Sequence, residues 1–296
     1  MYQLLGLKPN LATVRYLSRR HVMKQNRNSQ GRALKIAYKK FLSEIQPTVP
    51  QTSTIGVNFV EDRRLLNRFI DDFFRVDTPL NDLNQTKVIH SSGRHFRAHQ
   101  KRTLRRVEHV LNKMRVICPE FEKLVNMVVN SIFYAPSKVA SGGTSSAAVG
   151  VIWVNKLSQG EQDVLELLVH ESTHTLMFLD ELRYGHYWDY RLIPQKRNWV
   201  KSAVQGVKRP LDKVIHSLVV ATEVLLFRER CFGHPQKPNV HPLSSEMIQS
   251  CLETIQALRG ISQHKKILTK RSFFLIDNCE RAIHAHLLKA PKMAGG

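Results

Sequence analysis

Apolar residues recur at intervals of three and four along much of this chain, which is the period of an amphipathic α-helix. In residues 61–75, for example, Leu65, Leu66, Phe69 and Ile70 fall on one face that should pack against a core. The same criterion predicts helices in parts of residues 10–25, 30–45, 61–75, 96–115, 119–132, 161–180, 210–231, 245–258 and 263–289. The pattern therefore indicates a mainly α protein.

One short segment departs from the helical period. Residues 150–154, Gly-Val-Ile-Trp-Val, form a nearly continuous apolar run that is typical of a buried strand. Helical spacing then returns in residues 161–180, where Val164, Leu168 and Leu176 recur on one face. We expect a mainly α fold with a short strand or a small sheet beside this helix.

That helix carries an HExxH motif, formed by His170, Glu171 and His174. Residues four apart lie one turn apart on the same helical face, so both imidazoles can bind one metal ion. Glu171 is placed where it can polarise a metal-bound water. The alternative is that the two histidines lie on the helix and hydrogen-bond to carbonyl groups without any metal.

A metal centre that does chemistry needs at least a third protein ligand and an open position. The extended HExxHxxGxxH pattern is absent, because Met177 stands in place of its glycine. His186 is one candidate in the following loop, and the helix predicted within residues 210–231 offers His216 and Glu223. Those two are about 10.5 Å apart along a helix axis, so only one of them can bind the same ion. Glu223 is thus either the alternative ligand or a carboxylate that supports a ligand or the helix packing.

The motif, followed by an Arg-Pro-Leu run that begins at Arg209 and then by His216, resembles the HExxH-motif peptide-modification proteins. Members of this family act on ribosomally made peptides, and some are iron(II)- and 2-oxoglutarate-dependent peptide β-hydroxylases. The resemblance covers roughly residues 145–230. It implies that His170, His174 and His216 hold the metal and that Arg209 binds an anionic group of the co-substrate.

Three functions follow from these residues. In a hydroxylase, Arg209 would lie seven residues before His216 on the same helical face and bind the distal carboxylate of 2-oxoglutarate. In a zinc metallopeptidase, Glu171 would instead be the general base for a zinc-bound water. The third possibility is a basic binding protein in which the HExxH motif is not catalytic. The hydroxylase is favoured because of the family resemblance.

The charge of the chain points to an anionic partner. The 296 residues include 45 Lys and Arg against 24 Asp and Glu, which gives a formal net charge of +21. The excess is concentrated in residues 1–40, in the run from His95 to Arg115, and around Lys265 to Arg271. Within the second run, neighbouring helical positions are occupied by Arg97, Lys101, Arg102, Arg105 and Arg106.

The positive electrostatic field of these residues would attract an acidic peptide substrate or another polyanion. Nucleic acid is possible but not favoured, because no zinc finger, RNA-recognition signature or interleaved aromatic platform is apparent.

The organisation of the chain suggests a basic helical portion over residues 1–140, which would bind substrate, and a catalytic portion over residues 141–296. No apolar stretch is long enough to span a bilayer, and the four cysteines do not form metal-type pairs. We therefore expect a cytoplasmic protein with reduced thiols and no membrane partner.

Two loops are candidates for substrate contacts. The Gly- and Ser-rich residues 141–146 can shape the mouth of a site above the predicted strand. Beyond the HExxH helix, the aromatic side chains can either line a peptide groove or anchor their loop on the domain; they are Tyr184, Tyr187, Trp188 and Tyr190.

Overall fold

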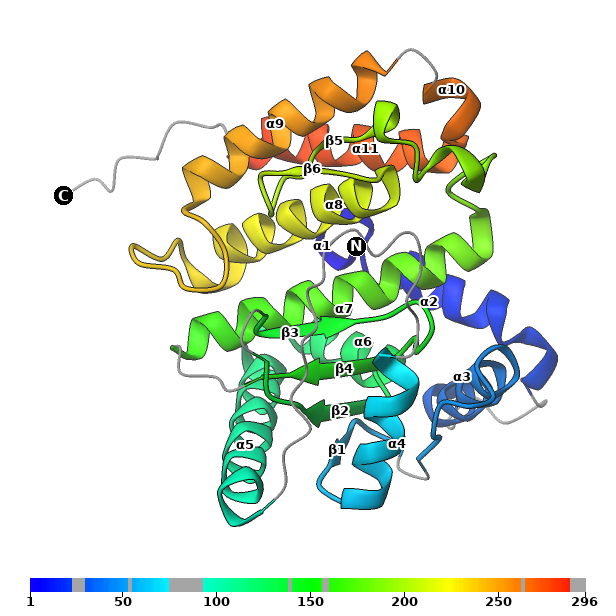
Figure 1. Ribbon diagram of the computed structural model, residues 1–296, viewed down its shortest axis with the longest axis vertical. Coiled ribbons are helices and arrows are strands. Elements are labelled where there is room, and N and C mark those ends of the chain that lie inside the picture. Colours follow the sequence, from blue (N-terminus) through cyan, green and yellow to red (C-terminus); the bar gives the residue numbers. More distant parts are fainter. Residues whose placement is uncertain are drawn as a thin grey trace. The chain divides into compact units, whose positions relative to one another are not determined.

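The computed structural model describes residues 1–22, 30–52, 55–74, 93–137, 140–155, 160–261 and 264–287, and these residues are mainly helical (Figure 1). The chain divides into two compact units. The sheet unit is Leu5–Arg183, and the helical unit combines Met1–Leu4 with Tyr184–Gly296. The expectation of a mainly α protein with a small sheet beside the HExxH helix is confirmed.

The sheet unit contains four strands and most of the longer helices. Its helices are α2 (Leu7–Leu17), α3 (Gln30–Ile45), α4 (Arg63–Phe74), α5 (Arg94–Ile117), α6 (Pro119–Val128) and α7 (Glu161–Tyr184), with a 3-10 turn at Arg19–His21. Its strands are β1 (Asn58–Val60), β2 (Ser131–Tyr134), β3 (Gly142–Thr144) and β4 (Val151–Val154). The strand order is β1-β2-β4-β3, in which β1, β2 and β4 are parallel and β3 is antiparallel at the edge. Figure 1 shows α7 running beside β3.

The central strands are apolar because both faces of the sheet are covered. Every residue of β2 and of β4 is buried, as is typical of parallel strands that lie between helices. Phe133 of β2 pairs in register with Trp153 of β4 and stacks on Phe69 of α4, with ring centroids 5.7 Å apart. The amphipathic face predicted for residues 61–75 therefore packs against this sheet, since Leu66 and Ile70 belong to the same core cluster.

A buried lysine closes the end of α6. Lys35 of α3 donates hydrogen bonds to the carbonyl oxygens of Met127 and Val129, at 3.0 and 2.9 Å, and Tyr38 donates to that of Val128 at 3.0 Å. The last carbonyls of a helix have no partners within the helix, so these donors satisfy them. Burial, with the nearby charge of Lys39, holds the pKa of Lys35 well below its ordinary value.

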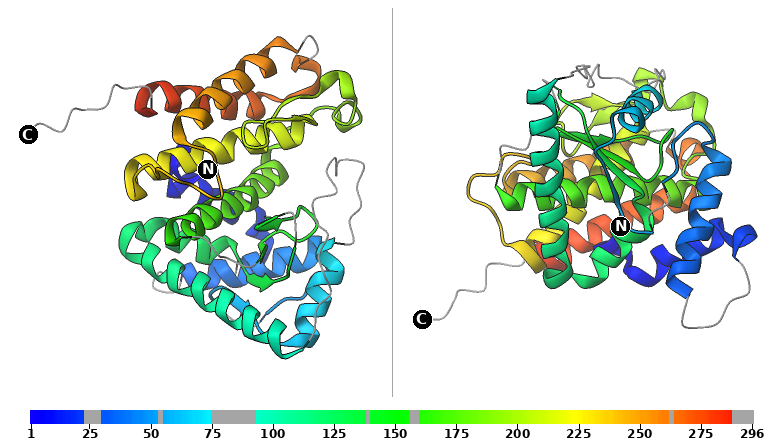
Figure 2. Two further views of the ribbon diagram at one scale, coloured as in Figure 1. Left: turned by 60° about the vertical axis from the view of Figure 1, so that its left-hand side comes forward. Right: turned by 90° about the horizontal axis from the view of Figure 1, so that it is seen from below.

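The helical unit is built around a buried helix. Its elements are α1 (Tyr2–Leu5), 3-10 turns at Tyr190–Leu192 and Lys196–Asn198, β5 (Val200–Lys201), β6 (Lys208–Arg209), α8 (Leu211–Phe227), π-helical turns at Arg228–Phe232 and Ile283–Leu287, α9 (Ser244–Gly260), α10 (His264–Ile267) and α11 (Lys270–Ala282). Figure 2 shows α8, α9 and α11 packed together, and all of α8 except Asp212 and Lys213 is buried. A helix that is apolar on all sides belongs to the interior of a domain. The π-helical turn after α8 ends at Gly233, whose φ of 78° favours glycine.

The structure differs from the sequence-based expectations at several boundaries. Residues 141–146 were expected to be a loop, but three of them form β3. The helix predicted in residues 119–132 ends at Val128, because residues 131–134 pair as β2. The two units also do not divide near residue 140. Residues 141–183 provide β3, β4 and α7, and the strands among them pair within the same sheet as β1 and β2.

All four cysteines are free, and Cys118, Cys251 and Cys279 are buried. None of the helices in the part of the chain that the structure describes is both long and apolar enough to cross a bilayer.

Candidate metal site

The two histidines of the HExxH motif face one another on α7. Their Nε2 atoms are 3.2 Å apart, the ring planes meet at 64°, and both side chains are half-buried. Two imidazole nitrogens bound to one tetrahedral zinc ion would be about 3.3 Å apart, given metal–nitrogen distances of about 2.05 Å. His170 and His174 are therefore spaced as two ligands of a single ion.

Helix α7 positions this pair rigidly. Its first turn is fixed where Asp163 accepts a hydrogen bond of 2.9 Å from the backbone N–H of Gly160, which is a helix-capping arrangement. Farther along, Phe178 stacks on the ring of His174, with centroids 6.4 Å apart. Because Phe178 lies one turn beyond His174, the helix itself provides this support for the imidazole.

Glu171 is the buried member of the motif, with only 3% of its surface exposed. Burial raises its pKa to about 8, and the hydrogen bond that it accepts from Thr144 acts in the opposite direction. The Thr144 Oγ1 to Glu171 Oε2 distance is 3.1 Å. A carboxyl group with such a pKa can either donate or accept a proton near neutral pH.

The edge strand β3 brings Thr144 to this position. A Cβ atom on Gly142 would lie 2.9 Å from the carbonyl oxygen of Trp153 in β4, so the close pairing of the two strands requires glycine there. Thr144 was not among the site residues predicted from the sequence. Its position in a Gly- and Ser-rich segment provides no periodic signal, and only the pairing with β4 reveals its place beside α7.

His216 lies on α8 in the helical unit and is buried. Burial lowers its pKa well below the ordinary value, and the charges of Lys213 and His186 act in the same direction. His216 is thus a neutral imidazole at pH 7, which is the protonation state that binds metals. His186 is also buried in the helical unit.

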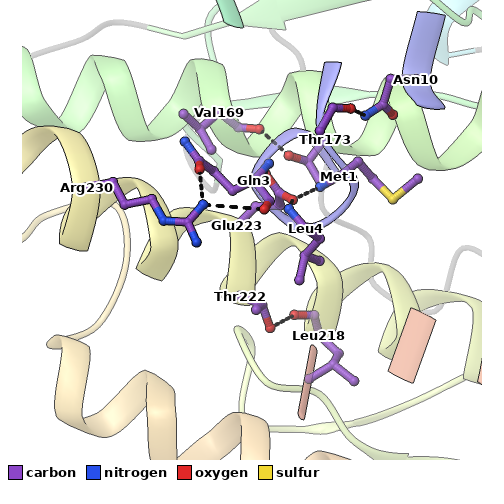
Figure 3. A network of polar contacts seen from close by, with 11 residues as sticks. Met1, Gln3, Leu4, Asn10, Val169, Thr173, Leu218, Thr222, Glu223 and Arg230 are labelled. Carbon is purple, nitrogen blue, oxygen red and sulfur yellow. Dashed lines mark hydrogen bonds and ion pairs between the residues drawn. The ribbon is translucent and has the colours of Figure 1, made fainter. Parts of the chain in front are cut away.

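Glu223, two helical turns after His216, contacts the N-terminal segment (Figure 3). Its Oε2 accepts a hydrogen bond from the backbone N–H of Gln3 and its Oε1 accepts one from that of Leu4, both at 2.9 Å. The N-terminal ammonium group of Met1 forms an ion pair with Oε1. Gln3 in turn accepts a hydrogen bond from Arg230 at 2.5 Å. A buried carboxylate without partners would be costly, and the N-terminal segment provides Glu223 with several.

Arg209 occupies a different element from the one expected. It lies in β6, where it pairs with Val200 of β5, and α8 begins only at Leu211, after Pro210. The expectation that Arg209 shares a helical face with His216 is therefore wrong. Proline has no N–H and fits the start of a helix, so the Arg-Pro sequence places the arginine just outside it.

The site residues predicted from the sequence belong to both units. His170, Glu171 and His174 are in the sheet unit, while Arg209, His216 and Glu223 are in the helical unit. Among the residues described by the structure, no group of three or more His, Cys, Asp or Glu side chains is placed to hold a metal ion.

Comparisons of the sequence with protein-family models and with curated proteins find no match.

The predicted basic face of α5 is a surface of the sheet unit. Arg97, Lys101, Arg102 and Arg105 are exposed, and Arg106 is half-buried. The opposite face of α5 carries Leu104, Val107, Val110 and Leu111 and is buried. Helical spacing thus places the cations on the solvent side of the helix.

Proposed function

We propose that this chain is a metal-dependent enzyme that hydroxylates a ribosomally made peptide with iron(II) and 2-oxoglutarate. The observation that supports a metal site is the 3.2 Å separation of the Nε2 atoms of His170 and His174. The family resemblance, and not a geometric observation, is the ground for assigning His216 as the third ligand and Arg209 to a carboxylate of 2-oxoglutarate. When bound, iron and 2-oxoglutarate activate dioxygen for insertion into a C–H bond of the peptide.

The protein's own side chains have separate tasks in this scheme. The neutral imidazole of His216 is ready to bind a cation without first losing a proton. The hydrogen bond from Thr144 fixes the position of the Glu171 carboxyl group. A carboxyl group held in this way can orient a ligand or a bound water by hydrogen bonding, as groups outside the ligand set of metalloenzymes do.

A zinc metallopeptidase is the second candidate, and Glu171 is the residue that favours it. Burial raises its pKa to about 8, so the ionised fraction that remains near neutral pH is a stronger base than an ordinary glutamate, as suits a general base for the attack of water on a peptide bond. Zinc would then be the metal at His170 and His174, and Glu171 would take the proton from the attacking water. The two candidates differ in the metal, in the need for 2-oxoglutarate and in the product.

An acidic peptide is the proposed substrate. The exposed cations of α5 produce a positive field that would attract it and speed its encounter with the enzyme. These residues are not part of the HExxH helix, so their contribution to capture is separable from the chemistry.

Elemental analysis and a peptide assay together test the proposal. The purified chain should contain iron, or accept it, and an acidic peptide should gain one oxygen atom only when iron(II), 2-oxoglutarate and dioxygen are present. The His174→Ala variant should lose the activity, and His109→Ala, at an exposed site, is the matched control. Cleavage of the peptide with bound zinc would establish the peptidase instead. Absence of metal and of any product would leave a basic binding protein with a non-catalytic HExxH motif.

A further inference from the structure

Two segments far apart in the sequence of the helical unit are paired, residues 186–188 with residues 267–269. Trp188 donates a backbone hydrogen bond of 2.8 Å to Ile267, and Thr269 donates one of 3.0 Å to His186. Tyr187 forms an antiparallel bridge with Leu268 between these bonds. The pairing brings the aromatic loop that follows α7 against Leu268 and Thr269, which connect α10 to α11 and are flanked by Lys266 and Lys270.

The loop exposes most of its aromatic side chains. Trp188 has 68% of its surface exposed, Tyr190 has 51% and Tyr184 has 44%, whereas Tyr187 is buried and anchors the loop. In α11, which follows the paired segment, Phe274 is 41% exposed. Large exposed aromatic side chains that gather at one place commonly mark a binding surface.

Cations are interleaved with these rings. The guanidinium group of Arg271 lies over the ring of Tyr184, 4.3 Å from its centroid, and over that of Phe274, 4.7 Å from its centroid. Such cation–π contacts orient the guanidinium group and leave its charge in place. Lys265 and Lys266 are exposed in the α10 segment, next to the residue that pairs with Trp188.

The acidic residue nearest to Phe274 in α11 is Asp277, one turn farther along, and it is paired with Arg259 at 2.9 Å. The sequence from residue 261 to residue 276 has no acidic residue. The aromatic loop contains Asp189, which forms an ion pair of 2.8 Å with Arg191. We define the aromatic–cationic surface as Tyr184, Trp188, Lys265, Lys266, Arg271 and Phe274.

We propose that the aromatic–cationic surface binds single-stranded nucleic acid, a function that is independent of the HExxH motif and goes beyond the proposed enzyme activity. Unpaired bases would stack on the indole of Trp188, and the lysines with Arg271 would contact the phosphates. This combination of π-faces and cations is how proteins bind single strands without sequence preference. The four residue steps from Tyr184 to Trp188 span at most about 14 Å when extended, a length that a few nucleotides cover.

The exposed tryptophan favours a nucleic acid over an acidic peptide. Carboxylates require only cations, which the face of α5 also provides, but in α5 the aromatic residue Phe96 is half-buried and packs against the core. Both surfaces are cationic, with five basic residues on the face of α5 and three on the aromatic–cationic surface, but only the latter exposes aromatic rings. The sequence did not indicate the aromatic–cationic surface, because Trp188 and the basic residues beside it are about eighty positions apart.

Fluorescence anisotropy with a labelled oligo(U) single strand and the full chain tests the proposal. Trp188→Ala, which changes no charge, should weaken binding about tenfold, because stacking of one base contributes about 1–3 kcal/mol. Trp188→Phe should retain most of the affinity. The double change Lys265→Ala with Lys266→Ala should flatten the dependence of log K on log salt by about 1.4, since each phosphate contact contributes about 0.7 for single strands.

Matched controls separate stacking from charge. Lys101→Ala with Arg102→Ala removes the same charge from α5 and should have little effect on oligo(U) affinity. Base stacking should also quench the fluorescence of Trp188, whereas Trp153 is buried and Trp199 is half-buried, with its indole N–H bonded to the carbonyl oxygen of Pro194. Circular dichroism and thermal melting should be unchanged in Trp188→Ala, because the indole is mostly exposed.

Several results would overturn the proposal. One is the absence of oligo(U) binding near physiological salt. Another is equal affinity of the wild-type chain and Trp188→Ala, with equal losses in the two double variants, because binding would then be diffuse electrostatics. Displacement of oligo(U) by an equal amount of polyglutamate would instead assign the surface to acidic polypeptides.

Discussion

Thr144 in the edge strand β3 donates a hydrogen bond of 3.1 Å to Oε2 of Glu171 in α7. This bond joins two segments that the sequence separates by a strand and a loop, and it fixes the carboxyl group at the centre of the HExxH motif. Because Glu171 is buried, loss of its donor would leave a costly polar group without that partner. The bond to Thr144 therefore helps to set the position and the protonation of the Glu171 carboxyl group.

The change Glu171→Gln distinguishes the two proposed chemistries. If Glu171 is the general base of a peptidase, the rate should fall by several orders of magnitude while metal stays bound. If dioxygen and 2-oxoglutarate do the oxidative work, the loss should be about 10–100-fold. Single-turnover kinetics and elemental analysis of the same samples measure the rate and the metal content.

Thr144→Val is the companion change. It removes only the hydrogen bond to Glu171 and should therefore reduce the rate less than Glu171→Gln does. Hydroxylation by Glu171→Gln at a tenth of the wild-type rate would exclude the peptidase mechanism for that reaction.

The third metal ligand can be identified by comparing two residues of α8. His170→Ala and His174→Ala should each abolish metal retention, because the remaining ligands cannot hold a catalytic ion well. His216→Ala should lose most of the metal, and Glu223→Gln should lose little. Elemental analysis after dialysis against a weak chelator gives the ranking. The opposite order at His216 and Glu223 would make Glu223 the ligand, and full occupancy in His174→Ala would disprove the site.

Glu223→Gln should strongly destabilise the protein even if metal binding is unaffected. The variant loses the charge that pairs with the ammonium group of Met1 and weakens the bonds to Gln3 and Leu4. Removing one partner of a buried ion pair typically costs about 3–5 kcal/mol. Urea unfolding measures the loss. Glu229→Gln, which breaks a largely exposed pair with His234, is the control and should cost less than about 1 kcal/mol. Similar free energies of unfolding for the two variants would mean that the contacts of Glu223 with the N-terminal segment contribute little to stability.

The buried amine of Lys35 should make stability depend on pH. Its pKa in the folded state lies below the ordinary value of 10.5. Between these two values the unfolded chain binds a proton that the folded protein does not, so the free energy of unfolding rises with pH. The slope is at most about 1.4 kcal/mol per pH unit. Below the lowered pKa, Lys35 is protonated in both states, and the full free-energy cost of burying its charge lowers the stability. Above 10.5 it is neutral in both states, so its contribution to the free energy of unfolding no longer changes with pH.

Lys35→Met should remove this slope. Unfolding free energies of the wild-type chain and the variant, measured across the alkaline range, give the contribution of Lys35 as their difference. Lys40→Met is the control, because Lys40 is exposed on the same helix and should leave the slope unchanged. Parallel curves for the wild-type chain and Lys35→Met would show that the amine keeps its ordinary pKa.

Charge reversal on α5 tests the capture of an acidic peptide. Lys101→Glu with Arg102→Glu should slow association and leave metal content unchanged, because exposed charges act mainly on the encounter rate. The effect should decrease above about 0.15 M salt, where the Debye length is about 8 Å. Stopped-flow binding of a labelled peptide gives the rates. Lys201→Glu with Lys208→Glu, two exposed positions on β5 and β6, is the charge-matched control. If excess RNA displaces the peptide from the wild-type chain, α5 binds polyanions in general.

The sequence alone predicted the features that depend on near neighbours. Helix α3 was expected over residues 30–45 and forms at those residues, and α4, α5, α7 and α9 lie within a few residues of their predicted ranges. The spacing of His170 and His174 follows from the same helical period. These features are local, since i to i+4 contacts define both the helix and the relation between the two imidazoles.

Tertiary structure decided the features that depend on distant residues. Strands β1 and β3 have only three residues each, too few to produce a periodic signal, and they are defined by pairing with β2 and β4. Glu223 meets Gln3 across 220 positions. Trp188 meets Ile267 through a backbone bond that no side-chain pattern encodes. Such contacts form only where packing brings separate segments together, because a backbone N–H can pair with any carbonyl within reach.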